Sequence, residues 1–304
     1  MNKYIINAGW KFKPTIKSYI AFITKENTTP EILELKVGSP LTIQVAANEP
    51  KFCVGFTNDV GEHVPCPTAE MILLNKFQCQ SCSLNEFFIC RSYCIGDFCN
   101  PSSENAKAHC WKTPAYVYIT YVGGKLKIGS TTSPIRRWIG QGSDAGIKIA
   151  EGVGLEPRAL EQHLSIVLSL PLAIRMSQKF KQIGISIDRD DITNQIESSL
   201  NQIYCSEIIK SKILIPRKEL ESIIFLDDYY GDINQLKARP LVKKLSNKGL
   251  LVSGNIVGVK GSILVLKNNE TYYATDLNSL IGLHQDLRNE VVKIKGQKSL
   301  FDFV

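Results

Sequence analysis

Residues 116–138 read YVYITYVGGKLKIGSTTSPIRRW, and the expected fold is built outward from this stretch. The β-branched and aromatic residues of Ala115–Val122 predict a strand, which a Gly-Gly turn connects to a returning strand at Lys125–Gly129. The Ser-Pro pair at 133–134 then indicates a helix start, because serine is a common cap and proline suits the first helical position. We therefore expect a hairpin followed directly by a helix.

Three further helices are expected downstream of this hairpin. The segments Leu155–Leu170 and Asp190–Tyr204 have helical patterns, and the second spaces its apolar residues to form one face. The third expected helix is Arg217–Phe225. Together with the hairpin, these elements predict an α+β domain with a small sheet and flanking helices.

The parts of the chain on either side of this domain are expected to be rich in strands. The N-terminal strands are predicted at Thr15–Thr24, Glu31–Val37 and Leu41–Val45, and the C-terminal strands between Leu250 and Asp276. Whether these two parts pair with each other is left open. Because 304 residues are long for one core, we divide the chain into five segments: 1–52, 53–113, 114–235, 236–295 and 296–304.

Eight of the nine cysteines lie close together in the sequence. They are Cys53, Cys66, Cys79, Cys82, Cys90, Cys94, Cys99 and Cys110. The two residues between Cys79 and Cys82 allow one tight turn to present two thiolates to Zn²⁺, and the segment has few apolar side chains for a core of its own. These features predict one or two structural zinc ions, with the grouping of ligands open and His109 as a further candidate. The alternatives are disulfides, or that Cys53 and Cys66 are simply buried small residues.

The charge balance is mildly basic, with 36 Lys and Arg against 29 Asp and Glu, so it permits a polyanionic partner without requiring one. No apolar run approaches the roughly 20 residues that a membrane span needs. No run of signal-peptide length follows the N-terminal lysines. We therefore expect a cytoplasmic protein, in which clustered cysteines favour metal ligation over disulfides.

The hairpin and the helix after it resemble those of the GIY-YIG nuclease family. Tyr116-Val117-Tyr118 stands where the family has its first motif, and Lys127-Ile128-Gly129 stands where it has its second. Arg137 occupies the place of the arginine on the family's first helix, and Glu161 that of the metal-binding glutamate on a later helix. The resemblance implies a GIY-YIG-like fold and cleavage of phosphodiester bonds.

The same resemblance implies roles for Tyr118, Arg137 and Glu161, and chemistry alone suggests one for Lys127. Tyr118 would be a general base or orient the nucleophile, Arg137 would stabilise charge on the scissile phosphate, and Glu161 would hold Mg²⁺ or Mn²⁺. Lys127, if desolvated beside Arg137, would have a lowered pKa and act as a base, or would bind phosphate. Further nucleic-acid contacts are expected from Tyr116, Lys125, Ser130, Arg136 and Trp138. The alternatives are plain strand packing for the tyrosines and a solvated helix face for the arginines.

A closer resemblance covers most of the chain. It is to a family of unknown function from archaea and bacteria, which joins a cysteine-rich segment to a degenerate GIY-YIG-like hairpin. This chain is similar to that family at Lys127–Ser130, Arg137–Gly142 and Ser253–Gly261. The lysine at 127 is the form in which that family has this motif.

The chain ends in GQKSLFDFV, which resembles the peptide that binds sliding clamps of the PCNA type. Gln297, Leu300 and Phe303 occupy its anchor positions, Phe301 precedes the last anchor by two residues, and Val304 replaces the final aromatic residue. A single helical turn would bring the leucine and the last phenylalanine to one face, where they would fill a pocket on the clamp. Docking of this segment on its own domain is the alternative.

Taken together, the patterns predict a zinc-containing DNA-processing protein of repair or replication. Its GIY-YIG-like domain would be a metal-dependent endonuclease, and its tail would tether it to the clamp. Two alternatives remain: a non-catalytic protein that only binds DNA or RNA, and a clamp-binding adaptor without nuclease activity.

Overall fold

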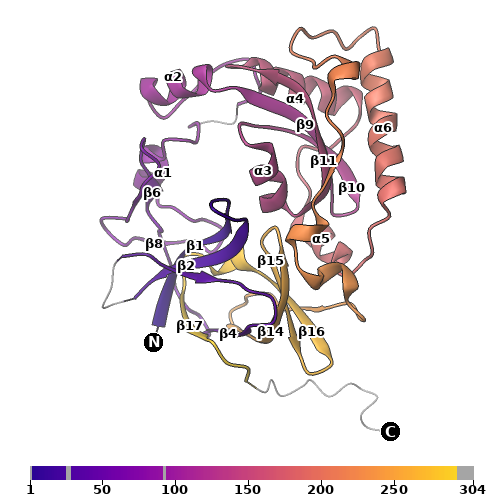
Figure 1. Cartoon of the computed structure of the whole chain (residues 1–304). Helices are drawn as coiled ribbons and strands as arrows, with labels where there is room; N and C mark the ends of the chain where they lie inside the picture. The colour runs from indigo at the N-terminus through magenta and orange to yellow at the C-terminus, as the bar shows by residue number, and fades with distance from the viewer. Residues whose placement is uncertain (1, 25–28, 92–93, 293–304) are drawn as a thin grey trace.

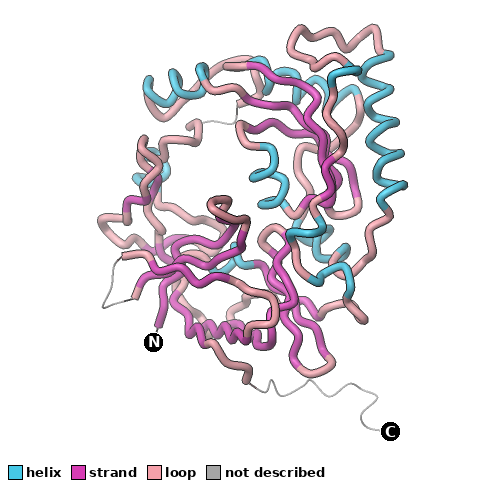
Figure 2. Tube along the Cα trace, in the orientation of Figure 1, coloured by secondary structure: helices cyan, strands magenta, loops and turns pink. Residues whose placement is uncertain are grey.

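The computed structural model describes residues 2–24, 29–91 and 94–292. They form a mixed α+β fold, as expected, in which a large sheet and a smaller sheet lie on either side of helix α3 (Figures 1 and 2). The clamp-like tail, with Gln297, Leu300, Phe301, Phe303 and Val304, lies outside the described residues.

The large sheet has nine strands in the order β13-β16-β15-β14-β4-β17-β1-β2-β3, and joins the two ends of the chain. Its strands are β1 (Asn2–Lys11), β2 (Lys17–Ile23), β3 (Glu31–Glu34), β4 (Pro40–Val45), β13 (Leu241–Val242), β14 (Leu250–Lys260), β15 (Ile263–Asn268), β16 (Thr271–Asp276) and β17 (His284–Arg288). The described pairs are antiparallel except β13 with β16.

The ends of the chain interleave within this sheet rather than lying side by side. Strand β4 pairs with β14 on one edge and with β17 on the other, and β17 in turn pairs with β1. Ile43 of β4 faces Val252 and Leu287 across these two ladders, and the three side chains share one apolar core. The two β-rich parts of the sequence therefore build one sheet.

The smaller sheet contains the predicted hairpin. Its strands are β9 (Ala115–Val122), β10 (Lys125–Thr131), β11 (Ser143–Gly152) and β12 (Ile224–Phe225), in the order β10-β9-β11-β12. Strand β9 has the predicted bounds, and its register with β10 confirms the hairpin. The helix expected at Arg217–Phe225 is wrong, because this segment holds only one 3-10 turn and then strand β12, which pairs with β11.

Helices cover both faces of the smaller sheet. They are α3 (Pro134–Gln141), α4 (Glu156–Val167), α5 (Met176–Gln182) and α6 (Arg189–Cys205). Val117 and Ile119 of β9 share a core with the apolar side of α6, which lines the outer side of the sheet in Figure 1. Tyr118 points to the opposite face and packs against Trp138 of α3. Helix α3 begins at the predicted position, although Ser133 makes no capping hydrogen bond.

The two sheets meet at a close contact between two turns. Gly142, which ends α3, and Gly261, between β14 and β15, approach so closely that a Cβ on Gly261 would lie 2.8 Å from the other glycine's nitrogen. Beside this contact, Lys260 and Asp144 form a buried ion pair. The hydroxyl of Tyr230 donates to the carbonyl of Ser143 at 2.6 Å. These contacts fix α3 relative to the large sheet.

The cysteine-rich segment contains only short elements. They are β5 (Lys51–Phe52), β6 (Phe56–Thr57), β7 (His63–Val64), β8 (Met71–Ile72), α1 (Gln80–Asn85) and α2 (Glu104–Lys112). Its large apolar side chains are largely exposed, among them Phe77, Phe88 and Phe98. Packing alone therefore contributes little to holding this segment, as its sequence indicates.

Four 3-10 turns complete the described structure, at Arg217–Glu219, Asp227–Tyr229, Asp232–Gln235 and Leu277–Leu280. Within the described residues, no helix combines the length and the apolar composition that crossing a membrane requires.

Candidate functional site

Four cysteines converge on one point in the cysteine-rich segment. We call Cys53, Cys66, Cys79 and Cys82 the cysteine quartet; their sulfur atoms all lie within 4.8 Å of one another. A tetrahedral zinc ion with Zn–S bonds of about 2.3 Å would place its sulfurs about 3.8 Å apart, so the quartet matches this donor set and size. It can hold a zinc ion.

The local chain prepares these sulfurs for a cation. Cys79 caps α1, and its sulfur accepts the Cys82 N–H at 3.5 Å, while the Cys53 sulfur accepts the N–H of Cys79 at 3.2 Å and of Gly55 at 3.4 Å. Burial, followed by the neighbouring sulfurs, raises the pKa of Cys82. Four thiolates cannot share this space without a positive ion, so the site needs a metal to be deprotonated.

The other four cysteines form a looser set. Burial raises the pKa of Cys90 and Cys110, and the charges of Cys94 and Cys99 raise it further, so these four lie near one another. Among the residues that the structure describes, however, the quartet alone has its ligand atoms at metal-binding separations. None of the nine cysteines is in a disulfide. A second zinc at this set therefore stays a prediction.

The second set lies against the smaller sheet's helix α4. Gly96, between Cys94 and Cys99, has φ of +94°, and a Cβ there would lie 2.3 Å from the Ala159 nitrogen. The neighbouring Arg158 lowers the pKa values of Cys90 and Cys110 against the larger effect of burial. The cysteine-rich segment thus contacts the helix that carries Glu161.

Polar side chains from β9, β10, α3 and α4 lie close to strand β10, with Tyr118 and Lys127 on the face of the smaller sheet toward α3 and Ser130 on the face toward α4. We call Tyr118, Lys127, Arg137 and Glu161, with Ser130, Gln141 and Arg158, the polar cluster. The Tyr118 hydroxyl lies against Gly129, where a Cβ would be 2.4 Å away, and it hydrogen bonds with Arg137 and Gln141. The glycine of the second motif is therefore required by the tyrosine of the first.

Lys127 is a buried cation within the polar cluster. Its ammonium group donates to Oε1 of Gln141 at 3.3 Å and lies 5.7 Å from the centre of the Tyr118 ring. Burial and then the charge of Arg137 lower its pKa to about 8. Burial raises the pKa of Tyr118, so the phenol stays protonated at neutral pH. Of the two, Lys127 has the pKa better suited to a general base.

Glu161 is the acidic member of the polar cluster. One carboxylate oxygen, Oε2, accepts from the Ser130 hydroxyl at 2.6 Å and from Arg158 at 2.7 Å. The residue is 3% exposed. Its charge is therefore already compensated by protein groups, and a divalent cation would have to compete with Arg158 for it.

The other residues expected to contact nucleic acid differ in how far they are exposed to solvent. Lys125 and Arg136 are exposed, and Tyr116 is half-buried with Lys148 over its ring. Ser130 points inward to Glu161. Trp138 is fully buried between Tyr118 and Gly146, so the expected surface contact of its ring is wrong. The helical period of α3 buries Trp138 and Ile139 and leaves Arg136 and Arg137 exposed.

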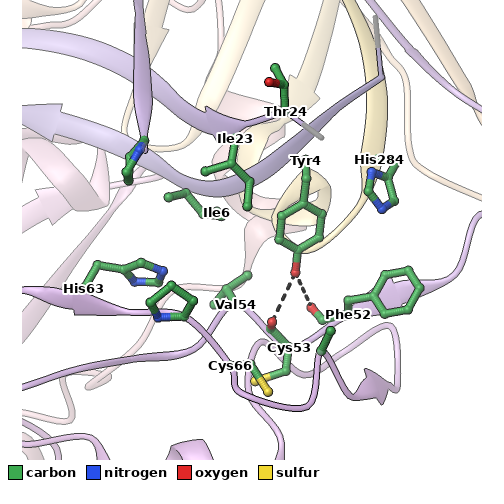
Figure 3. Close-up of a pocket in the computed structure, with 13 residues that line it drawn as sticks. Tyr4, Ile6, Ile23, Thr24, Phe52, Cys53, Val54, His63, Cys66 and His284 are labelled. Atoms are coloured by element: carbon green, nitrogen blue, oxygen red, sulfur yellow. Dashed lines mark hydrogen bonds between the residues drawn. The ribbon is translucent and has the colours of Figure 1, made fainter. Parts of the chain in front are cut away.

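An apolar pocket of about 390 Å³ adjoins the quartet (Figure 3). Tyr4 crosses it and donates its hydroxyl to the carbonyl oxygens of Phe52 and Cys53, at 3.1 and 3.2 Å. Sequence inspection does not identify this pocket, because its walls come from β1, the cysteine-rich segment and His284 of β17.

A larger cleft of about 1030 Å³ shares Ile6, Val54 and His63 with that pocket. Its walls are the β1–β2 hairpin, the quartet's neighbours and the first turn of α3, which face one another in Figure 1. The sequence predicts Arg136 as a nucleic-acid contact but does not indicate the residues that form the other walls.

Residues 42–283 match the model of a family described as "Protein of unknown function (DUF2797)". The chain belongs to this family. The match includes both cysteine sets and the polar cluster, whereas strands β1–β3 and β17 lie outside it. No curated protein and no solved structure matches the chain.

Proposed function

We propose that this protein of the DUF2797 family binds nucleic acid through the exposed Arg137 of the polar cluster. The observation that carries the proposal is the convergence of Tyr118, Lys127, Arg137 and Glu161, which the GIY-YIG resemblance assigns to one phosphate site. Arg137 is exposed while its charge acts on both Tyr118 and Lys127, so a phosphate bound there would contact a preformed positive site.

Binding is favoured over cleavage by the state of Glu161. Its Oε2 accepts two hydrogen bonds from protein groups, which supports a structural role. Metal-dependent endonuclease activity is the second candidate. It is favoured by the pKa of Lys127, which burial lowers to about 8, near the range in which a general base works. In that case Mg²⁺ or Mn²⁺ would bind Glu161 and displace Arg158.

One experiment separates these two functions. Labelled DNA and RNA, linear and branched, are incubated with the zinc-loaded protein with and without Mg²⁺, and both binding and cleavage are measured. Arg137→Ala should weaken binding of all sequences and reduce the slope of log affinity against log salt by about 1. Arg239→Ala, an exposed arginine outside the polar cluster, is the control.

Glu161→Gln decides between binding and cleavage. Under the binding function it leaves affinity unchanged and there is no Mg²⁺-dependent product to lose. Under the nuclease function it abolishes product while affinity is retained. A wild-type protein that binds neither DNA nor RNA at low salt rules out both.

We further propose that the C-terminal peptide binds a sliding clamp of the PCNA type, on the basis of the sequence of residues 296–304. The protein would then work in replication or repair. Phe303→Ala should abolish clamp binding in a calorimetric titration and leave nucleic-acid binding intact. Equal clamp affinity in the wild type and the variant would contradict this.

A further inference from the structure

The cleft of about 1030 Å³ beside the polar cluster is lined by cations. Lys11 and Lys13, at the end of β1, and Arg136, on α3, all contribute to its walls and are exposed. Among the residues that the structure describes, none of the three forms a salt bridge. Their charges are therefore available to an anionic partner.

The acidic group in the cleft lining does not cancel these charges. Glu86 is buried, and its Oε2 accepts from the Thr57 N–H at 3.0 Å and from the Gln78 side chain at 2.8 Å. It thus serves to hold the wall of the cleft together. The balance of charge facing the cleft is positive, which selects an anion.

Aromatic rings line the cleft together with these cations. The rings are Trp10, Phe12, Tyr19, Phe56 and Phe77. The guanidinium of Arg136 lies 5.6 Å from the centre of the Phe12 ring, and 43% of Phe77 is exposed. Positive charge together with exposed and half-buried rings is the combination on which unpaired bases stack while the backbone follows the cations. A duplex hides the faces of its bases and would leave the rings unused.

The cysteine quartet and α3 position the walls of this cleft. Val54, Gly55 and Phe56 follow Cys53 directly, and Phe77 and Gln78 precede Cys79. On the opposite wall, Arg136 is the neighbour of Arg137, whose charge acts in the polar cluster. A strand held by Arg136 therefore contacts the same turn of α3 that carries Arg137.

We infer that the cleft is a binding channel for single-stranded nucleic acid, which leads an unpaired strand past Arg136 to the polar cluster. This inference rests on the proposed nucleic-acid binding and specifies its substrate as an unpaired strand. The contacts described do not distinguish DNA from RNA, so the test includes both sugars.

The test uses the full-length, zinc-loaded protein and fluorescence anisotropy. The probes are labelled oligothymidylate and oligouridylate of about 20 nucleotides and a duplex of equal length, between about 50 and 200 mM salt. Phe77→Ala should weaken strand binding about 5- to 100-fold, because it removes one stacking surface. Since this ring is largely outside the core, the variant should fold normally, which its circular dichroism and zinc content verify.

A second variant tests the charges separately. The double substitution Lys11→Ala with Lys13→Ala should reduce the slope of log affinity against log salt by about 1.4, since each contact with a single strand contributes about 0.7. Lys218→Ala, an exposed lysine outside the cleft, should change neither slope nor affinity.

Two outcomes overturn the channel: strand affinity that is unchanged in both cleft variants, or a wild-type protein that binds the duplex as tightly as the strand. If Arg137→Ala still weakens nucleic-acid binding in that case, the proposed function stands and the channel alone fails. If strand binding depends on the cleft while Arg137→Ala has no effect, the channel stands and the phosphate site fails.

Discussion

The cysteine quartet and the polar cluster are both groups of chemically active side chains with buried members, but only one of them is held together by protein contacts alone. The quartet's sulfurs contact one another and backbone N–H groups, and within the described part of the chain no lysine or arginine is among the groups that most strongly shift the pKa of Cys53, Cys66 or Cys82. In the polar cluster, Glu161 is compensated by Arg158 and Ser130, and the Lys127 ammonium donates a hydrogen bond to Gln141. The difference indicates that a metal ion would stabilise the quartet, whereas the polar cluster is held together by protein groups alone.

The largest effect should come from breaking the quartet. Cys79→Ser removes a ligand that is also the cap of α1, and structural zinc sites of peptides are worth roughly 10–16 kcal/mol. We expect loss of one zinc ion per chain and unfolding of the segment around it, measured by metal analysis and by proteolysis. Cys205→Ser, at an exposed cysteine outside both sets, should retain zinc and stability. Full zinc content in Cys79→Ser would refute the site.

A smaller effect, and of opposite sign, is expected for Lys127→Met. Burial lowers the pKa of Lys127 from 10.5 to about 8, a shift that disfavours the folded state by up to about 3 kcal/mol at neutral pH. Removing the charge should therefore stabilise the protein at pH 7, as measured by urea unfolding. Lys125→Met, an exposed lysine on the same strand, should change stability by less than about 0.5 kcal/mol.

A second test compares how the stability of the wild type and of Lys127→Met depends on pH. Between pH 8 and 10.5 the unfolded chain holds the Lys127 proton and the folded protein does not, so this residue makes stability rise with pH across that window. The rise should be present in the wild type and absent in Lys127→Met. Parallel curves for the two proteins would show that the ammonium is not buried as described.

The smallest effect should come from Ser130→Ala, which removes one of two described hydrogen bonds to Glu161. A buried bond to a charged group is worth about 1.5–3 kcal/mol, and Arg158 remains to compensate the carboxylate. Ser133→Ala is the matched control, because its hydroxyl makes no capping bond. Equal unfolding midpoints for the two variants would show that Glu161 does not depend on Ser130.

Local pattern was enough to predict the hairpin and α3, because adjacent residues determine them. Strand β11 was not predicted, since its sequence SDAGIKIAEG is rich in small residues. One of them, Gly146, is required because the Trp138 ring packs directly on it. The strand at Ile224–Phe225 likewise depends on a distant partner, β11. Helical spacing does not reveal which face of α3 meets a sheet, so the exposed position expected for Trp138 was wrong.

The spacing of the cysteines likewise predicted only the part of the metal site that lies within one turn. The pair Cys79 and Cys82 could be assigned to one metal from spacing, whereas Cys53 and Cys66 join them only because β5 and the following turns fold back. The interpretation of those two as simple buried residues does not fit their position among the sulfurs. The cleft could not be predicted from local pattern, since its lining residues come from four separate stretches of the chain, 6–32, 54–89, 133–136 and 278–281.

The interleaving of β4, β14, β17 and β1 has a consequence for synthesis on the ribosome. The N-terminal strands leave the exit tunnel more than 200 residues before the strands that flank β4. Until those emerge, β4 presents two unpaired edges, and such contacts between distant segments form slowly. Nascent chains of this protein should therefore bind chaperones that shield exposed strands. The smaller sheet and its helices, residues 115–225, should fold before the large sheet.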